Sequence, residues 1–456
     1  MKRVLLISFY FPPRQAIGAV RPTGLKKYLS RFGWECVVVT PKLGSAGRSM
    51  PNVIETGYVD VLEEWKRKLR FDPKQSVHAQ LGLSETKKKN TEAPHTFLLT
   101  RLKEVLTYPD PMKGWIPFAC DEIDKLAGKG IDAIISSAPP ISAHLIGQHA
   151  KRVLNCPWVA DFRDLWTQNV DTHTSPIRPF ERRLERKLLA DADALVTVSD
   201  DWAAKLKSRY TDVPVHTITN GFDPEDFPES KIDLTDRFSI TYTGLLYQGK
   251  RDPTPLLEAM QELIREGKLP REKVWLRFYG PVETWLTTVV SRCGLQDVTE
   301  LPGVIPRDQA IKRQRESQLL LQLGWHDRRE KGQHTGKLFE YLGSRRPILA
   351  LGGTPGAMSD VLAHTEAGVH VQTKEEVKQY LLESYREFAQ NGFVRYRGKE
   401  DVIAQYSHLV MARTFANLLD SLAHSTPPNR IAEESHFRPA STGTSARAAT
   451  SGQMVI

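Results

Sequence analysis

Short apolar runs alternate with amphipathic stretches along this chain, and no other feature constrains its fold as strongly. Apolar runs at residues 4–8, 36–40, 131–136, 158–160 and 195–199 have the length of strands, and helical patterns lie beside them. Buried strands separated by helices are typical of a parallel sheet that is covered on both faces. The sequence therefore predicts an α/β protein.

A second round of the same alternation follows a turn-rich linker at residues 223–236. Five further strands are expected, at residues 239–242, 274–279, 319–323, 347–351 and 368–371. We therefore predict two doubly wound domains, one over residues 1–222 and the other over residues 237–404.

Three segments do not follow this alternation. Residues 45–117 carry lysine clusters and scattered Trp and Phe, and we expect an insertion there and no sheet element. Residues 405–424 predict an apolar helix. Residues 425–456 are rich in Ser, Thr, Pro, Gly and Ala, which predicts a disordered tail.

The charge balance favours anionic partners. The formal net charge is +9, so phosphate-bearing ligands and an anionic membrane surface are expected partners. No basic stripe interleaved with aromatic residues occurs, and no nucleic-acid-binding signature is present. We therefore expect no nucleic-acid partner.

Cysteine usage and hydropathy indicate the compartment. The 4 cysteines lie far apart, which predicts neither a metal site nor a disulfide framework and fits a reducing environment. The N-terminus leads directly into a predicted strand, so no signal peptide is expected. No apolar run approaches the ~20 residues of a membrane span. We expect a cytoplasmic protein, peripheral at the inner face of a membrane.

Two distant segments carry residues that suit a diphosphate. Gly244, Lys250 and Arg251 follow a predicted strand, and Gly336 and Lys337 open a predicted helix. A diphosphate binds cations and the free N–H groups of a helix start. Ligands of such sheets sit at the carboxyl ends of the strands, where both segments fall. The sequence predicts that these residues bind a nucleoside diphosphate.

Two more residues extend this site. Glu340 lies on the first turn of the same predicted helix, and its carboxylate can accept hydrogen bonds from two ribose hydroxyls. Gly18 lies in the loop after the first strand, where a missing side chain would let backbone N–H groups approach the phosphate.

Asp161, Arg163 and Asp164 cluster at the end of the strand expected at residues 158–160. A carboxylate there could orient or deprotonate an acceptor hydroxyl. The alternative is that Arg163 pairs with Asp161 or Asp164 in a structural ion pair.

Taken in order, these motifs resemble the family 4 retaining glycosyltransferases of the GT-B fold, the glycogen-synthase-like group, and among them the bacterial enzymes that build cell-surface polysaccharides. The resemblance covers residues 1–424. It is carried by residues 11–13, 18–21, 136–140, 157–166, 190–193, 196–199, 220–223, 244, 250–253 and 337–341.

The resemblance implies two Rossmann-like domains facing a cleft, with the donor on the second domain and the acceptor on the first. It implies that the helix at residues 405–424 crosses back to the first domain. The implied activity is the retaining transfer of a hexose or hexosamine from a nucleoside-diphosphate sugar to a hydroxyl of a glycan or lipid-linked acceptor. Neither a metal nor a further cofactor is expected.

The predicted site residues follow from the motifs and the resemblance together. The donor-binding set is Gly18, Gly244, Lys250, Arg251, Gly336, Lys337, Leu338 and Glu340. The catalytic set is Asp161, Arg163, Asp164, Lys250 and Arg251. The spacing from Gly244 selects Lys250 for the diphosphate, whereas the Arg-Asp-Pro pattern selects Arg251, so both stay in the prediction.

One departure from the family pattern leaves alternatives open. Gly332 occupies the position of the first Glu in the family's Glu-x7-Glu motif, although Glu330, Gln333 and His334 are close by. A sugar-nucleotide 2-epimerase on the same fold and a catalytically inactive binding protein therefore remain as alternatives.

Other motifs receive structural interpretations. Asp191-Ala-Asp193 has the D-x-D pattern of metal-dependent transferases, but it ends a helix before a buried strand, so we expect no metal there. Residues 181–187 predict a solvated helix with i,i+4 ion pairs. The insertion, which includes Trp65 and Trp115, is either a membrane-facing acceptor segment or a plain solvated excursion.

Overall fold

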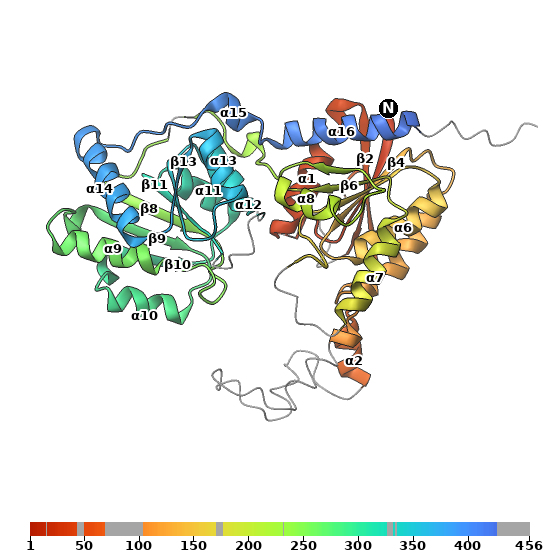
Figure 1. Ribbon diagram of the computed structural model, residues 1–456, viewed down its shortest axis with the longest axis horizontal. Coiled ribbons are helices and arrows are strands. Elements are labelled where there is room, and N and C mark those ends of the chain that lie inside the picture. The colour runs from red at the N-terminus through yellow and green to blue at the C-terminus, as the bar shows by residue number, and fades with distance from the viewer. Residues whose placement is uncertain are drawn as a thin grey trace, which may run out of the picture.

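The computed structural model describes residues 1–14, 16–42, 50–68, 104–169, 177–230, 232–325, 332 and 335–425. These residues form two α/β domains that lie side by side (Figure 1). Each domain has its own parallel sheet, and helices cover the sheet faces. The predicted α/β architecture of two doubly wound domains is confirmed.

The N-terminal sheet has seven strands in the order β3-β2-β1-β4-β5-β6-β7, and all of its pairs are parallel. The strands are β1 (Lys2–Ser8), β2 (Trp34–Pro41), β3 (Val53–Thr56), β4 (Ala133–Ala138), β5 (Trp158–Phe162), β6 (Ala194–Thr197) and β7 (Val215–Thr217). The helices are α1 (Ile17–Tyr28), α2 (Val61–Lys68), α5 (Ile116–Asp124), α6 (Ser142–Leu154), α7 (Arg178–Leu189) and α8 (Asp200–Lys207).

The C-terminal sheet has six parallel strands in the order β10-β9-β8-β11-β12-β13. They are β8 (Phe238–Thr243), β9 (Val274–Tyr279), β10 (Thr299–Gly303), β11 (Leu319–Leu323), β12 (Ile348–Leu351) and β13 (Gly368–Val371). The helices are α9 (Thr254–Arg265), α10 (Thr284–Arg292), α11 (Arg307–Arg315), α12 (Gly336–Ser344), α13 (Ala357–Thr365), α14 (Lys374–Asn391), α15 (Glu400–Ala404) and α16 (His408–Ser425).

The last helix, α16, leaves the C-terminal domain and lies across the N-terminal one (Figure 1). Its apolar residues Met411, Phe415 and Leu419 are buried in one cluster with Val4 and Leu25. Burial of apolar surface at about 25 cal/mol per Å² fixes the helix there. The helix predicted at residues 405–424 therefore packs as part of the N-terminal domain.

Ten predicted strands correspond to strands of the structure, and three strands were not predicted. The missed strands β3, β7 and β10 are short edge strands of the two sheets. The prediction that residues 45–117 contain no sheet element is wrong, because β3 pairs with β2 through residues such as Val53 and Val38. Much of that segment, and residues 426–456 of the expected disordered tail, lie outside the described residues.

The prediction of i,i+4 ion pairs in residues 181–187 is also wrong for the described residues. Glu181 is buried and pairs with Arg178, three residues earlier. Glu185 is fully buried and accepts a hydrogen bond from the Thr167 hydroxyl. Both carboxylates therefore face the protein interior, so they are unavailable to the exposed cations of α7. Among the described residues, no helix is both long and apolar enough to span a membrane.

Candidate functional site

A cavity of about 550 Å³ lies between the two domains, at the carboxyl ends of both sheets. This volume is typical of a site for a small molecule or cofactor. The N-terminal domain lines it with Ile17, Gly18, Val20, Arg21, Arg163, Asp164, Asn220 and Gly221. The C-terminal half of the chain lines it with Thr243, Gly244, Leu245, Tyr247, Arg251, Tyr279, Gly280, Pro281, Val304, Ile305, Ala310, Thr335, Gly336, Lys337, Glu340 and His408.

Two cations of the C-terminal domain line this cavity, and each has a nitrogen atom without a hydrogen-bond partner among the described residues. The Nζ atom of Lys337 is buried and has no hydrogen-bond partner among the described residues. It lies 3.6 Å from the centroid of the Tyr242 ring. Arg251 is only 8% exposed, and its Nε atom is likewise buried without a partner. Buried cations without acceptors are costly, so the arrangement favours an anionic ligand.

The pKa of Lys337 reflects its burial and the charges beside it. Burial holds the pKa of its ammonium well below the ordinary value, and repulsion by Arg251 lowers it further. Attraction by Glu340 acts in the opposite direction. A bound diphosphate would supply negative charge beside the ammonium and favour its protonated form.

Gly244 makes the approach to Lys337 possible. Its φ is +125°, a backbone conformation that favours glycine, and a Cβ there would lie 2.8 Å from the Lys337 Nζ. Gly336 begins α12, whose first residues also line the cavity. Free N–H groups of a helix start add positive potential at this point.

Glu340 lies beside these cations in a network of polar side chains. One carboxylate oxygen, Oε1, accepts a hydrogen bond from Gln314 Nε2 at 2.6 Å. The other, Oε2, lies 3.4 Å from Arg307 Nε. Gln314 also donates to Thr243 Oγ1 and accepts from Ser344 Oγ. The carboxylate is thus oriented by the protein while it still lines the cavity.

On the opposite side, Asp161 lies beneath the cavity and is fully buried. Arg21 holds both of its carboxylate oxygens, at 3.0 Å from Nε and 2.8 Å from Nη2. The Ser137 hydroxyl donates a third hydrogen bond at 2.8 Å. The remaining Arg21 donors bind the carbonyls of Ile218 and Thr219. This set is complete without a ligand.

Arg163 lines the cavity, but it too is satisfied within its own domain. Its guanidinium donates to the backbone carbonyls of Gly18, Ala138 and Pro139. The predicted structural ion pair of Arg163 with a carboxylate does not form, since Asp161 pairs with Arg21 instead. A Cβ at Gly18 would lie 2.8 Å from Arg163 Nη1, so the packing favours glycine at this position.

Asp164 is the carboxylate that the N-terminal domain exposes to the cavity. It makes no hydrogen bond or ion pair with any residue that the structure describes. The side chain is exposed to the cavity, but the surrounding protein withdraws water from the carboxylate. This desolvation raises the pKa of the carboxyl above its ordinary value. The Arg163 charge opposes that shift.

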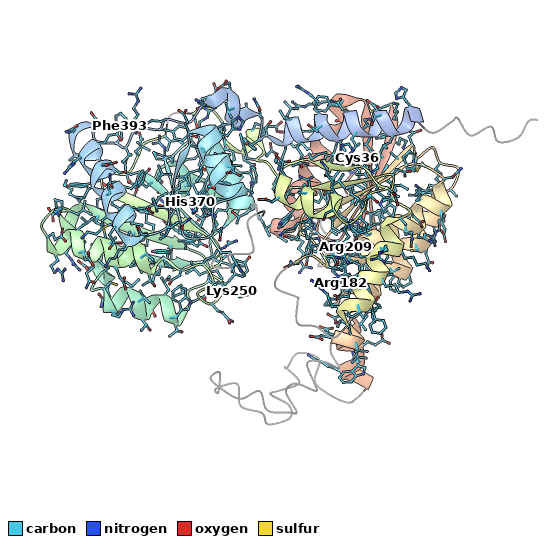
Figure 2. All side chains as sticks on the ribbon, in the orientation of Figure 1. Cys36, Arg182, Arg209, Lys250, His370 and Phe393 are labelled. Atoms are coloured by element: carbon cyan, nitrogen blue, oxygen red, sulfur yellow. The ribbon has the colours of Figure 1, made fainter. Side chains whose placement is uncertain are left out.

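Two predicted site residues lie away from the cavity. Lys250 is exposed and its Nζ lies 4.6 Å from the centroid of the Trp325 ring. Figure 2 shows it at the edge of the C-terminal domain that faces the other domain. Leu338 is fully buried in the core beneath α12, so it positions the helix without lining the cavity.

The Gly332 departure has a packing explanation. Its carbonyl accepts a hydrogen bond from Ser199 Oγ at 2.7 Å, which joins the two domains. A Cβ at Gly332 would lie 2.2 Å from Trp202 Cδ1. A glutamate therefore cannot replace Gly332 in this packing. Glu330, Gln333 and His334 lie outside the described residues.

The two carboxylates of the D-x-D pattern, Asp191 and Asp193, pair with other residues of the N-terminal domain. Asp191 accepts from Gln148 and Arg152, and Asp193 accepts from Lys151 and the Trp158 N–H.

Sequence reasoning assigned no role to several residues of the site. Arg21 lies in one of the segments that carry the family resemblance, but no local pattern in the sequence indicates its partner Asp161. Gln314 and Arg307 belong to the highly polar helix α11, in which no pattern shows the inward side chains. His408 begins α16 and reaches the cavity from the far end of the chain.

Comparisons with known proteins give one family model and a set of similar folds. Residues 20–226 match the family model described as Glycosyltransferase Family 4. No curated protein matches the sequence.

Solved structures show the fold. Sucrose-phosphate synthase from Thermosynechococcus elongatus superposes with a TM-score of 0.61 at 14% identity, covering 93% of this chain and 100% of that one. HepE from Anabaena, in complex with UDP-glucose, gives a TM-score of 0.57 at 14% identity, with 92% and 100% covered. A protein described as a UDP-N-acetylglucosamine 2-epimerase from Listeria monocytogenes gives 0.50 at 14% identity, with 95% and 100% covered. The two domains thus have the GT-B architecture.

Proposed function

We propose that this protein is a retaining glycosyltransferase that moves a hexose or hexosamine from a nucleoside-diphosphate sugar to a hydroxyl of a glycan or glycolipid. One observation carries the proposal. Lys337 Nζ and Arg251 Nε have no hydrogen-bond partner among the described residues, and both side chains line one cavity with the start of α12 and the carboxylate of Glu340. Cations, helix N–H groups and a carboxylate together match a diphosphate joined to a ribose.

Each group has a role in the proposed reaction. The bond between the sugar carbon and the diphosphate breaks, and the nucleoside diphosphate leaves with the electron pair. Arg251, Lys337 and the start of α12 stabilise that growing charge, so neither a metal nor a cofactor is required. Glu340 holds the ribose. The acceptor oxygen forms the new bond to the sugar carbon on the face from which the diphosphate leaves, so the configuration is retained, and the acceptor releases its proton to Asp164.

The remaining predicted residues support this arrangement. Gly18 and Gly244 keep the walls of the cavity close to the phosphates. Asp161 acts through Arg21, because it is buried beneath the site. Arg163 fixes the loop that carries Gly18, since it binds that residue's carbonyl.

A screen of nucleotides tests the donor class. UDP, GDP, ADP and their sugars are mixed with the full chain, and thermal unfolding is followed. A specific ligand at a hundredfold excess over Kd adds about 2.7 kcal/mol of stability. Hydrolysis or transfer of the donor that binds, lost in Glu340→Ala, supports the proposal. No stabilisation by any nucleotide would contradict it.

The same donor assay separates the alternatives. A 2-epimerase, whose fold is shared by the Listeria protein, would yield epimerised sugar from donor without acceptor, visible by NMR. A catalytically inactive binding protein would bind the donor and leave it intact. Transfer to an added glycan or glycolipid acceptor excludes both.

Helix α7 favours a location at the inner face of a membrane, consistent with a lipid-linked acceptor in surface polysaccharide biosynthesis. Arg182, Arg183, Arg186 and Lys187 are exposed on it, and none pairs with a described residue. Phe180, at the start of the same helix, is 67% exposed. Figure 2 shows Arg182 on the outside of the N-terminal domain. Each such cation contributes about 1 kcal/mol near an anionic bilayer.

Vesicle sedimentation tests this location. Vesicles containing phosphatidylglycerol should bind the full chain, whereas phosphatidylcholine vesicles should not. Arg182→Glu with Arg186→Glu should abolish that binding. The matched control, Arg265→Glu with Arg386→Glu, reverses two exposed charges on the C-terminal domain and should leave it intact. Equal binding by both double variants would contradict the role of α7.

A further inference from the structure

His408 is a buried polar side chain for which the reaction above gives no role. It is 2% exposed, yet it lines the cavity that also contains Glu340 and Arg251. Neither of its ring nitrogens has a hydrogen-bond partner of ordinary geometry among the described residues. A hydrogen bond with the Gly221 backbone, outside ordinary geometry, raises the pKa of the ring. Buried polar atoms in folded proteins are nearly always paired, so an unpaired imidazole at a cavity points to a ligand.

The backbone around His408 is fixed where the chain crosses between domains. The His408 N–H donates to the Phe222 carbonyl at 2.8 Å, and the Phe222 N–H donates to the Tyr406 carbonyl at 3.0 Å. The ring packs against Gly24 of α1, where a Cβ would lie 2.6 Å from the His408 Cγ. Since α16 is packed into the N-terminal core, His408 moves with the first domain.

The charges around the imidazole favour its neutral form. Burial lowers its pKa to about 4, and the Arg21 and Arg307 charges act in the same direction against the attraction of Asp223. A neutral imidazole has one donor and one acceptor nitrogen, which suits a hydroxyl better than a phosphate.

The position of His408 indicates which hydroxyl is close. Arg307, whose charge acts on His408, also lies 3.4 Å from the Glu340 carboxylate. His408 and Glu340 line the same cavity, and Arg307 acts electrostatically on both. Arg251 and Lys337, which line the same cavity, are the groups that suit the phosphates.

We propose that His408 hydrogen-bonds a ribose hydroxyl of the donor nucleotide from the N-terminal side of the cavity. This inference rests on the proposed function. The ribose is then held by Glu340 on the C-terminal domain and by His408 on the N-terminal body. Nucleotide binding consequently ties the two domains together through one sugar ring.

Titration calorimetry on the full chain tests this contact. Among UDP, GDP and ADP, the one that binds the wild type is measured with His408→Leu, which removes both nitrogens, and with His408→Gln, which keeps a donor and an acceptor. We expect His408→Leu to weaken binding about tenfold, the value of one buried hydrogen bond. His408→Gln should restore most of it, and inorganic pyrophosphate should bind both variants as it binds the wild type.

The 2′-deoxy and 3′-deoxy forms of the same nucleotide identify the hydroxyl. One of the two deoxynucleotides should bind the wild type about tenfold more weakly than the parent nucleotide does. The same deoxynucleotide should bind His408→Leu with the affinity that the parent nucleotide has for that variant. The control variant His370→Leu removes a histidine of β13 whose Nε2 donates to the Gly352 carbonyl at 2.8 Å, outside the cavity, and it should bind like the wild type. Thermal unfolding without ligand verifies that each variant is folded.

The outcomes separate this inference from the proposed function. Unchanged nucleotide affinity in His408→Leu overturns the contact and leaves the donor site standing. Equal losses for pyrophosphate and nucleotide show a purely structural role and overturn it as well. Failure of the wild type to bind any of the three nucleotides overturns both proposals.

Discussion

The two sides of the cavity both present cationic side chains but use them in opposite ways. On the N-terminal side, Arg21 holds Asp161 with two nitrogens, and Arg163 donates to three backbone carbonyls. On the C-terminal side, Lys337 Nζ and Arg251 Nε have no partner among the described residues. One domain uses its cations to hold its own loops, whereas the other leaves them available to a ligand.

This difference separates residues that build the site from residues that bind in it. A buried cation that is fully paired contributes to structure, because its removal leaves a carboxylate or carbonyls without partners. A buried cation without partners destabilises the empty protein and gains its partner only on binding. The same chemical group should therefore respond to mutation in opposite ways on the two sides.

The largest expected effect on stability is at Arg21. Arg21→Met leaves the fully buried Asp161 carboxylate without its counter-ion, which should cost about 3–5 kcal/mol in the free energy of unfolding. Denaturant unfolding of the full chain measures the loss. Arg21→Met with Asp161→Leu removes both charges and should recover much of it. If Arg21→Met were as stable as the wild type, the pairing of Arg21 with Asp161 would have no structural role.

Lys337 should show the reverse behaviour. Lys337→Met removes a group that stabilises the leaving diphosphate, so kcat should fall about 10²–10³-fold, as when one charge-stabilising donor is lost. The unfolding free energy without ligand should be unchanged or higher, because a buried unpartnered charge has gone. Kinetics and unfolding are measured on one preparation. Loss of stability together with full activity would contradict the comparison.

Asp164 gives the N-terminal side its own ligand-facing group, and its titration should appear in the pH profile. Burial raises the pKa of this carboxyl, so the ionised form that accepts a proton is reached only as pH rises through that raised value. Transfer activity should therefore rise with pH, with a midpoint above the ordinary carboxyl range. Asp164→Asn should lower kcat about 10²-fold and remove that acidic limb. If activity of Asp164→Asn still fell at acid pH as in the wild type, the titrating group would be another residue.

Linear motifs explain how much of the site was predictable. Gly244, Arg251, Lys337 and Glu340 follow strands of one parallel sheet, and the sheet brings the carboxyl ends of its strands together. Spacing along the chain was sufficient to predict that they meet. The fold was predictable for the same reason, since buried central strands such as β11 read as continuous apolar runs.

The rest depended on contacts between distant segments. Arg21 and Asp161 are 140 residues apart, and no local pattern identifies them as partners. The edge strand β10 contains Pro302 and few apolar residues, so it lacks a strand signal. On α7, the i,i+4 steps within residues 181–187 join like charges, Glu181 to Glu185 and Arg182 to Arg186, and both carboxylates bind buried partners instead. Tertiary burial decided these cases.

The smallest expected effect is at Lys250, which the sequence could not distinguish from its neighbour Arg251 as the diphosphate ligand. Lys250 is exposed above Trp325, whereas Arg251 is buried and lines the cavity. An exposed cation–aromatic contact is worth about 0.5–1 kcal/mol, so Lys250→Ala should change kcat/KM by less than about fivefold. Arg251→Ala should lose about 10²-fold or more, and adding Lys250→Ala to it should change little. Steady-state kinetics of the three variants with one donor measure this. Equal losses in the two single variants would mean that the diphosphate reaches the rim of the C-terminal domain, and that the cavity wall alone does not bind it.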